Sequence, residues 1–304
     1  MPLVPWIAVL RSGAPIVATF HVHREEGHRW YPRYRRLLDP LMARVRRRLA
    51  VSDAARRTVA DAFPGRYEIL PNGIDVERFA TPVPRPPQMP VGRLHTVYVG
   101  RLEPRKGVDR LLRAMVRVQQ EHAAARLVIV GEGPDRSALE SLARQLGVDA
   151  LFAGRVSDAQ LPSYLQAADV VSSPALSGES FGIVLLEALA SGRPVVATRI
   201  PGYAELAADT DSVRLVTPDD VDALAKEIGS LLGDAAQRAA MGARGPAVAS
   251  RFAWGRVAER LEAIYAEVVA DQADQTATSG RNEYGRSGLK ASDASDRFER
   301  PFTR

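Results

Sequence analysis

Residues 95–130 read HTVYVGRLEPRKGVDRLLRAMVRVQQEHAAARLVIV, and this stretch decides the fold class. Residues 95–99 and 126–130 are apolar runs of strand length, and residues 108–122 between them have the spacing of an amphipathic helix. A helix between two strands is typical of a crossover unit, in which both strands lie parallel in one sheet. The stretch therefore predicts an α/β domain built on a parallel sheet.

The same alternation of strand and helix continues toward residue 252. The expected strands are residues 151–153, 169–172, 194–198 and 215–216. The expected helices are residues 135–146, 159–168, 183–190, 220–232 and 237–252. This order predicts helices on both faces of the sheet, and such sheets bind ligands beyond the carboxyl ends of their strands.

A smaller unit of the same kind precedes residue 80. Residues 15–20 are a continuous apolar run, which predicts a parallel strand buried on both faces. The elements expected to follow are a helix over 32–48, a strand over 48–52, a helix over 53–63 with Ser52 as its N-cap, and a strand over 67–70.

Proline marks the boundary between the two units. Residues 81–92 (TPVPRPPQMPVG) contain five prolines, which predicts a stiff linker. The predicted organisation is a partial N-terminal domain, a linker, a C-terminal domain, a final amphipathic helix and a tail, over residues 1–80, 81–92, 93–252, 253–270 and 271–304. The tail is predicted to be disordered because it is polar, rich in Ser, Asp and Arg, and lacks periodicity.

Composition excludes several classes of function. The 304-residue chain has no cysteine, so it has neither a disulfide framework nor a thiol nucleophile. Five scattered histidines argue against a zinc site. A net charge of +5 is too small to indicate a nucleic-acid partner, although it suits anionic small molecules or an anionic membrane surface. No apolar stretch is long enough to span a bilayer, and a cytoplasmic location is the default expectation.

The loop GRLEPRKG, residues 100–107, follows a buried strand and leads into a helix. Two glycines bracket three cations there, and the free N–H groups of a helix start favour an anion. Arg101 offers a bidentate fork and Lys106 a compact charge, which together suit a diphosphate. The alternative is a solvated basic loop, but this loop contains one of only three lysines in the chain.

A second candidate segment is SGESFGIVLLE, residues 177–187. Residues 181–183 mark the start of a helix, whose N–H groups can face phosphate. Glu179 lies in the preceding loop, where the alternative is a solvated side chain. Glu187 falls inside an otherwise apolar helical run, so its carboxylate needs a partner. That partner is either a ligand diol, such as a ribose, or a cation of the protein.

His21 is the third candidate, delivered with His23 to the carboxyl end of the first predicted strand. A histidine in this position suits hydrogen bonding or general acid–base chemistry. The alternative is a packed surface or core histidine. The chain has no Walker-type phosphate loop and no local Ser/His/Asp pattern.

Six segments together resemble the retaining family 4 glycosyltransferases, which have the GT-B fold of two Rossmann-like domains. Two of them are GRLEPRKG at 100–107 and GESFGIVLLEALASGRPVVAT at 178–198, with glutamates eight positions apart. The others are ATFHVH at 18–23, AVSDAARR at 50–57, PNGIDVERF at 71–79 and GRVSD at 154–158. The resemblance spans residues 3–268 and is closest to the actinobacterial phosphatidylinositol mannosyltransferases.

The resemblance implies a nucleotide-sugar donor as substrate. Arg101 and Lys106 would neutralise the donor diphosphate. The backbone of Phe181, Gly182 and Ile183 would cradle the β-phosphate and the sugar. No metal or other cofactor is required in this interpretation, because fixed cations stabilise the leaving diphosphate.

The other singled-out residues also have implied roles. Glu179 would bind hydroxyls of the transferred hexose, and Glu187 would hold the ribose. Val156 and Asp158 would flank the base. His21 would lie near the anomeric centre and stabilise the transition state.

The resemblance further implies hexosyl transfer with retention, first of all of mannose from GDP-mannose, to an acceptor hydroxyl. The acceptor is a phosphoinositide-type lipid or another alcohol. The alternatives are a UDP-sugar with a soluble acceptor, and a catalytically impaired chain that only binds the donor. Family members have a longer N-terminal segment, so the N-terminal domain is expected to be incomplete, with helix 254–269 crossing back onto it.

Seven arginines between residues 33 and 48 fall in one predicted helix that also contains Leu37, Leu38, Leu41 and Met42. Such a helix suits a peripheral contact with anionic lipid at the inner face of the plasma membrane. The alternative is a solvated helix of the N-terminal domain. The oligomeric state is not predicted.

Overall fold

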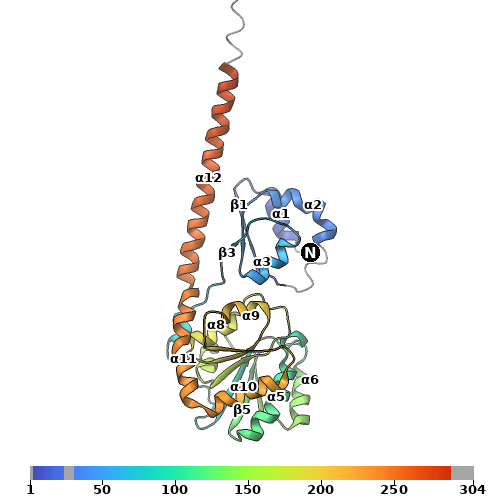
Figure 1. The fold of residues 1–304 in the computed structure, drawn as a ribbon, viewed down its shortest axis with the longest axis vertical. Coiled ribbons are helices and arrows are strands. Elements are labelled where there is room, and N and C mark those ends of the chain that lie inside the picture. Colours follow the sequence, from blue (N-terminus) through green and yellow to red (C-terminus); the bar gives the residue numbers. More distant parts are fainter. Residues whose placement is uncertain (1–2, 24–30, 289–304) are drawn as a thin grey trace, which may run out of the picture.

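The computed structural model describes residues 3–23 and 31–288, which form two α/β units, each with a parallel sheet, and the long helix α12 runs beside the N-terminal one (Figure 1). The N-terminal unit has a three-stranded parallel sheet in the order β1-β2-β3. Its elements are α1 (Leu3–Arg11), β1 (Ile16–Phe20), α2 (Tyr31–Ala43), β2 (Val45–Ala50), α3 (Asp53–Ala60) and β3 (Glu68–Ile69).

The C-terminal unit is a six-stranded parallel sheet in the order β6-β5-β4-β7-β8-β9. Its strands are β4 (Leu94–Val99), β5 (Ala125–Val130), β6 (Ala150–Gly154), β7 (Val170–Ser173), β8 (Val195–Thr198) and β9 (Val213–Val216). Its main helices are α5 (Val108–Glu121), α6 (Arg136–Leu146), α7 (Leu161–Gln166), α8 (Ile183–Ala190), α10 (Val221–Gly233) and α11 (Ala235–Ala249). The order reverses between β4 and β7, and sheets of this type bind ligands at that point.

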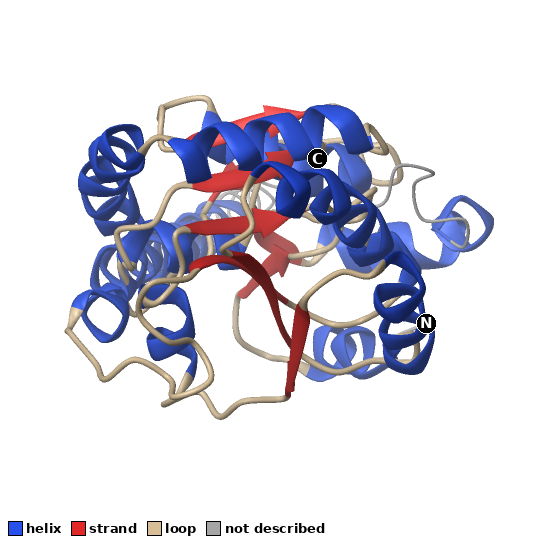
Figure 2. Ribbon diagram, turned by 90° about the horizontal axis from the view of Figure 1, so that it is seen from below, coloured by secondary structure: helices blue, strands red, loops and turns tan. Residues whose placement is uncertain are grey.

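Helices cover both faces of the C-terminal sheet, as Figure 2 shows from below. Alternate residues of β4 face opposite cores: Val97 joins the apolar cluster that contains α8, and Tyr98 joins the one with α5 and α10. Both side chains are almost completely buried. A strand buried on both faces explains why residues 95–99 read as a nearly continuous apolar run.

Gly107 separates the short 3₁₀ turn η1 (Pro104–Lys106) from α5 with a φ of +67°, in the left-handed region. A Cβ atom there would lie 2.2 Å from the carbonyl oxygen of Pro174. Gly107→Ala should therefore lower the free energy of unfolding by about 2–3 kcal/mol. Gly147→Ala is the matched control, because Gly147 has a φ of +66° and open space around it. Denaturant titration measures both; equal losses would contradict the contact with Pro174.

The predicted helix over residues 32–48 is wrong in its last five residues, 44–48. α2 ends at Ala43, and Val45–Ala50 form β2, the central strand of the N-terminal sheet. Leu49 and Ala50 are completely buried, whereas the arginines before them extend to the surface. The sequence pattern does not indicate this strand, because the run of arginines at residues 46–48 lacks the apolar alternation of a half-buried strand. The seven arginines consequently do not share one helix.

β1 is not buried on both faces as predicted. Among the described residues only β2 pairs with it, and its side chains are half-buried or exposed. Its apolar side chains line a cavity of about 870 Å³ together with residues of α1 and α12, among them Trp6 and Val268. The continuous apolar run therefore packs only partly on helices, with Ile16, Ala18 and Phe20 against α2 and α3 and Val17 against α12. The rest of its apolar surface lines this cavity.

The last helix, α12 (Trp254–Gly288), continues through residues where composition predicts a disordered tail. Its first half lies on the N-terminal unit, where Ile264 and Val268 join Leu49 in an apolar cluster. Arg260 pairs with Glu68 of β3 at 2.6 Å. Residues 271–288 contain no proline, so nothing in the sequence forces the helix to stop earlier. The rest of the predicted tail, residues 289–304, lies outside the described residues.

Two short helices are absent from the sequence prediction. α4 (Val76–Ala80) contacts α7 and α8, and its Phe79 is buried in the apolar cluster that contains α8. α9 (Pro201–Ala207) follows β8 and contacts α3 of the N-terminal unit. Helices this short show too few turns for a periodic apolar pattern to reveal them.

Candidate active site

A pocket of about 140 Å³ lies at the carboxyl ends of β4 and β7, where the order of the sheet reverses. Lys106 reaches it from the loop after β4, and Glu179 from the loop after β7. Of the residues predicted from the sequence, the pocket brings together Lys106, Glu179, Phe181, Gly182 and Ile183. Asn72 also lines the pocket, which sequence reasoning missed although the residue lies in a recognised segment.

A compact charge cluster forms one wall of this pocket. Glu179 Oε1 accepts hydrogen bonds from Lys106 Nζ at 2.7 Å and from Arg105 Nη1 at 2.5 Å. Arg105 Nη2 also lies 2.6 Å from Glu103 Oε1. The side chains of Lys106 and Glu179 are each only 17% exposed. Although burial alone lowers the pKa of Arg105, Glu179 raises it overall, so the guanidinium keeps its charge.

Arg101 does not join this cluster. Its side chain is 74% exposed, and the carboxylate of Glu103 is 3.9 Å away. The Tyr98 hydroxyl donates to the Arg101 carbonyl, and the next residue, Leu102, is completely buried. This backbone arrangement turns residue 101 outward, while the turn at residues 104–106 directs both of its cations toward Glu179. Arg105, which the sequence analysis did not single out, is the arginine that joins Lys106 and Glu179 in this cluster.

The start of α8 forms the opposite wall. Gly182 precedes the helix with a φ of +93°, and a Cβ atom there would lie 2.9 Å from the Tyr203 ring. Phe181 is buried and packs edge-on against Phe252, with ring centroids 5.7 Å apart. The first N–H groups of a helix have no partner within it, so those of Ile183 and its neighbours are available to an anion in the pocket.

Glu187 lies on α8 one turn beyond the pocket. Burial raises the pKa of its carboxyl to about 7; the charge of Arg78 opposes this shift, and that of Asp158 adds to it. Arg78 also donates a hydrogen bond to the Asp158 backbone oxygen. Asp158 is exposed and Val156 half-buried. Glu187, Asp158 and Arg78 therefore form a second charged group outside the pocket, in which Arg78 is a residue that sequence reasoning missed.

His21 lies in a different cavity from Glu179. It is exposed at the carboxyl end of β1 and lines the apolar cavity of about 870 Å³ in the N-terminal unit. His23 is held more firmly, because its Nδ1 atom lies 3.1 Å from both the Ala54 carbonyl oxygen and Thr58 Oγ1. The structure therefore does not bring His21 into the pocket with the other predicted residues.

Comparison with known proteins agrees with this architecture. Residues 84–248 match the family model for glycosyl transferases group 1, and residues 1–78 match the model for glycosyltransferase family 4. The phosphatidyl-myo-inositol mannosyltransferase of Mycolicibacterium smegmatis is 35% identical over 268 residues, which cover 88% of this chain and 69% of that protein.

Two further similarities concern the donor and the fold. The GDP-mannose-dependent monoacylated alpha-(1-6)-phosphatidylinositol monomannoside mannosyltransferase of Corynebacterium glutamicum is 34% identical over 280 residues, covering 87% of this chain and 73% of that protein. The crystal structure of Anabaena HepE in complex with UDP superposes with a TM-score of 0.76 at 24% identity, covering 87% of this chain and 76% of that one. The latter likeness shows a shared fold.

Proposed function

This chain belongs to the family 4 glycosyltransferases, enzymes of the GT-B fold, and from that premise we propose that it moves a hexose from a nucleotide sugar to an acceptor hydroxyl with retention of configuration. The observation that carries the proposal is the pocket between Lys106 and the start of α8, with Arg105 behind it. Two cations and a helix N-terminus around one position suit the diphosphate of a departing nucleotide.

In the proposed reaction the bond from the sugar C1 to the β-phosphate oxygen breaks, and the acceptor oxygen bonds to C1 from the same face. The acceptor proton passes to the departing phosphate oxygen. Lys106 and Arg105 stabilise the negative charge that grows on the diphosphate, together with the N–H groups at Gly182 and Ile183. Arg101 stays a predicted contact of the same diphosphate. Metal independence also stays a prediction, which transfer assays in EDTA would test.

The remaining proposed roles are those that the family resemblance implies. Glu179 accepts hydrogen bonds from hexose hydroxyls, and Glu187 from the two ribose hydroxyls. Val156 and Asp158 flank the base. His21 serves the anomeric centre only if the N-terminal unit carries it toward the pocket, and its role stays a prediction.

The proposed donor is GDP-mannose and the proposed acceptor an inositol-containing lipid. Support comes from the names of the two mannosyltransferase relatives, which are 35% and 34% identical to this chain over the aligned residues. A UDP-sugar is the competing donor, since the similar Anabaena structure holds UDP. Calorimetry with GDP-mannose, UDP-glucose and UDP-GlcNAc should show GDP-mannose binding most tightly. Tighter binding of a UDP-sugar would reassign the donor, and binding of none would contradict the proposed function.

The raised pKa of Glu187 predicts a pH-dependent affinity for the nucleotide. Only the ionised carboxylate can accept both ribose hydrogen bonds, so affinity should fall as pH falls through about 7. GDP should bind about tenfold more weakly at pH 6 than at pH 8 through this group alone. Calorimetry on the wild type and on Glu187→Gln isolates the effect, because titration of the GDP phosphate contributes equally to both. Parallel pH profiles for the two proteins would contradict the assignment.

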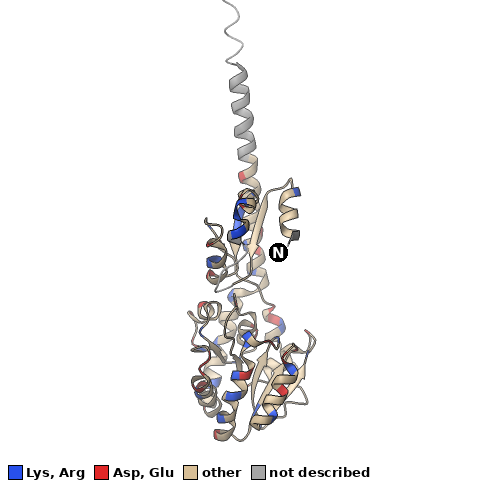
Figure 3. Ribbon diagram, turned by 90° about the vertical axis from the view of Figure 1, so that its right-hand side faces the viewer, with Lys and Arg blue, Asp and Glu red and all other residues tan. Residues whose placement is uncertain are grey.

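We also propose a peripheral membrane contact through α2, where Arg33, Arg35 and Arg36 are exposed next to Leu37, itself 70% exposed. Figure 3 marks several basic residues in the N-terminal unit, and all of them are arginines because residues 1–80 contain no lysine. In the described part of the chain no helix is both long and apolar enough to cross a bilayer. Flotation with phosphatidylinositol vesicles should be salt-sensitive and lost when the three arginines become serine. Flotation that persists in that variant would contradict the contact.

A further inference from the structure

Helix α9 is fixed directly against the donor pocket. A Cβ atom on Gly202 would lie 2.5 Å from the Glu179 carbonyl oxygen, so the start of the helix touches the backbone of the pocket loop. The Tyr203 hydroxyl lies 2.8 Å from Ser173 Oγ at the end of β7, and its ring lies against Gly182. These contacts leave the first turn of α9 little freedom to move independently of the pocket.

The same helix reaches across to the N-terminal unit through Glu205. Its Oε2 atom accepts a hydrogen bond from the Asp53 N–H, and its Oε1 atom one from the Ala54 N–H, both at 2.7 Å. These are the first two amides of α3, and Ser52 Oγ accepts from the third, that of Ala55, at 3.0 Å. A carboxylate at a helix N-terminus satisfies free N–H groups and complements the positive end of the helix dipole. Glu205 thus caps a helix of the other unit.

α3 in turn holds the segment that follows β1. The Ala54 N–H donates to Glu205, while the Ala54 carbonyl lies 3.1 Å from His23 Nδ1. Thr58, one turn further along α3, contacts the same nitrogen at 3.1 Å. His23 is two residues from His21, the predicted transition-state residue. A continuous set of contacts therefore runs from the pocket loop through α9 and α3 to the β1 loop.

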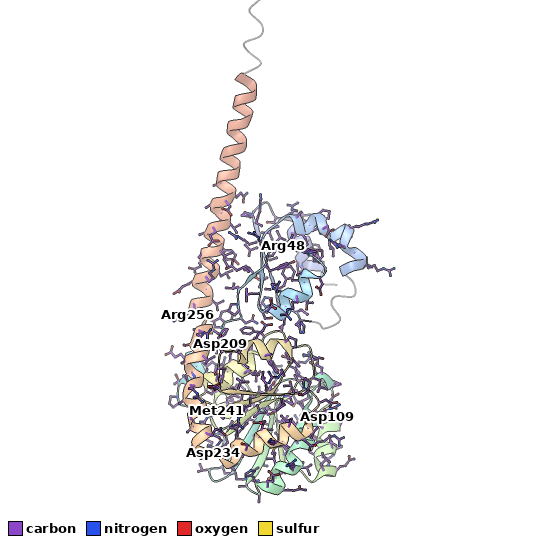
Figure 4. The ribbon with its side chains drawn as sticks, in the orientation of Figure 1. Arg48, Asp109, Asp209, Asp234, Met241 and Arg256 are labelled. Atoms are coloured by element: carbon purple, nitrogen blue, oxygen red, sulfur yellow. The ribbon has the colours of Figure 1, made fainter. Side chains whose placement is uncertain are left out.

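Figure 1 shows α9 on the side of the C-terminal unit that faces α3. Figure 4 places Asp209, just beyond α9, toward the N-terminal unit, in which Arg48 lies. Glu205 is itself exposed, so its two hydrogen bonds are open to competition from water. An exposed bidentate contact of this kind can hold two units in register and still release when they move.

We propose that Glu205 is a positioning residue for glycosyl transfer, which sets the orientation of the N-terminal unit, and with it His21, relative to the donor pocket. The proposal rests on the proposed function for its catalytic consequence. Its structural part stands independently of the identity of the donor: the Glu205 carboxylate holds α3 to α9 in addition to the buried apolar cluster that Ala55 and Leu206 share.

The absence of cysteine makes a direct test straightforward. Asp61→Cys beyond α3 and Gln145→Cys on α6 place one spin label on each unit at exposed positions. Pulsed electron–electron double resonance between the two spin labels should give one narrow distance distribution in the otherwise wild-type chain. In Glu205→Ala the distribution should broaden or shift. Glu227→Ala is the matched control, because Glu227 pairs with Arg214 inside the C-terminal unit at 2.7 Å and should leave the distribution unchanged.

Kinetics provide the second readout. With GDP-mannose and phosphatidylinositol vesicles, Glu205→Ala should lower kcat about tenfold or more, because the N-terminal unit that carries His21 is no longer held in one orientation, while the Kd for GDP stays unchanged. Glu205→Gln keeps one acceptor oxygen for one of the two amides and should fall between wild type and Glu205→Ala. If Glu205→Ala does not fold, as circular dichroism would show, Glu205→Gln carries the test in both readouts.

The outcomes separate this inference from the proposed function. An unchanged distance distribution in the Glu205 variants overturns the inference, whatever the chain binds. A changed distribution with unchanged GDP affinity and reduced kcat supports it. A changed distribution with wild-type kcat shows that the contact is structural only and overturns the positioning role. Failure of the wild type to bind GDP would contradict the proposed function, while the distance measurement would still decide whether Glu205 holds the units.

Discussion

Replacing Lys106 with alanine is expected to weaken the binding of GDP by about 30- to 100-fold. Lys106 is 17% exposed and points its Nζ atom at the pocket wall, 2.7 Å from Glu179 Oε1. In this half-buried position its charge is poorly screened by water, so removing it strongly weakens the electrostatic attraction to a bound diphosphate. In the variant the Glu179 carboxylate keeps only Arg105 as a neighbouring cation. Its negative charge is then less neutralised and repels the diphosphate more strongly.

The measurement is calorimetric titration of GDP into the wild type and into Lys106→Ala. Lys226→Ala is the matched control, since Lys226 is exposed on α10 and its removal changes the net charge by the same amount. The control should bind GDP as the wild type does. Similar affinities in all three proteins would show that Lys106 does not contact the diphosphate, and equal losses in both variants would indicate only a net-charge effect.

Glu179→Gln is expected to separate binding from transfer. In the structure the Glu179 carboxylate holds both Lys106 and Arg105, so an incoming diphosphate competes with it for these two cations. Neutralising the carboxylate removes this competitor, and GDP affinity should stay level or rise about two- to fivefold. Transfer should nevertheless fall about 10- to 100-fold, because a hexose hydroxyl loses its charged acceptor.

Two assays check this prediction, the Kd for GDP and the rate of mannosyl transfer to phosphatidylinositol vesicles. Glu121→Gln serves as the control, because Glu121 pairs with Arg117 on the exposed face of α5 and should change neither quantity. A parallel loss of GDP binding and transfer in Glu179→Gln would mean that the carboxylate mainly maintains the shape of the loop. Unchanged transfer would remove Glu179 from the hexose site.

The C-terminal unit could be predicted from the sequence because its signals are strong and local. β4 and β5 are buried on both faces, so their residues read as apolar runs, and α5 between them has one clearly apolar face. The glycine at 107 is required by a positive φ and by the closeness of Pro174, which is why it marks the end of the cation-bearing loop. Parallel topology then places the loops after β4 and β7 side by side, which yields the pocket.

The structure departs from the sequence analysis where distant contacts decide the conformation. β2 is a strand because Leu49 and Ala50 are buried beside β1 and β3, whereas its arginines alone resemble a helix surface. Arg105 rather than Arg101 meets Glu179 because the backbone around Leu102 is held by packing in the core. No local pattern in the sequence distinguishes these two arginines.

The N-terminal unit illustrates the same limit. The apolar run at β1 predicts a strand, but not that its side chains face a cavity. Glu205 shows no pattern in the sequence at all, since its partners are two backbone amides more than 150 residues earlier in the chain. Contacts between a side chain and a distant backbone are set by the packing of whole units, and only the folded structure reveals them.

The most direct test of the account is a crystal structure of the full chain with GDP bound. The account predicts that the β-phosphate lies between Lys106 Nζ and the N–H groups at Gly182 and Ile183, that the ribose hydroxyls reach Glu187, and that the base lies by Val156. A diphosphate bound elsewhere, with Lys106 still paired to Glu179 and the start of α8 facing only solvent, would contradict it.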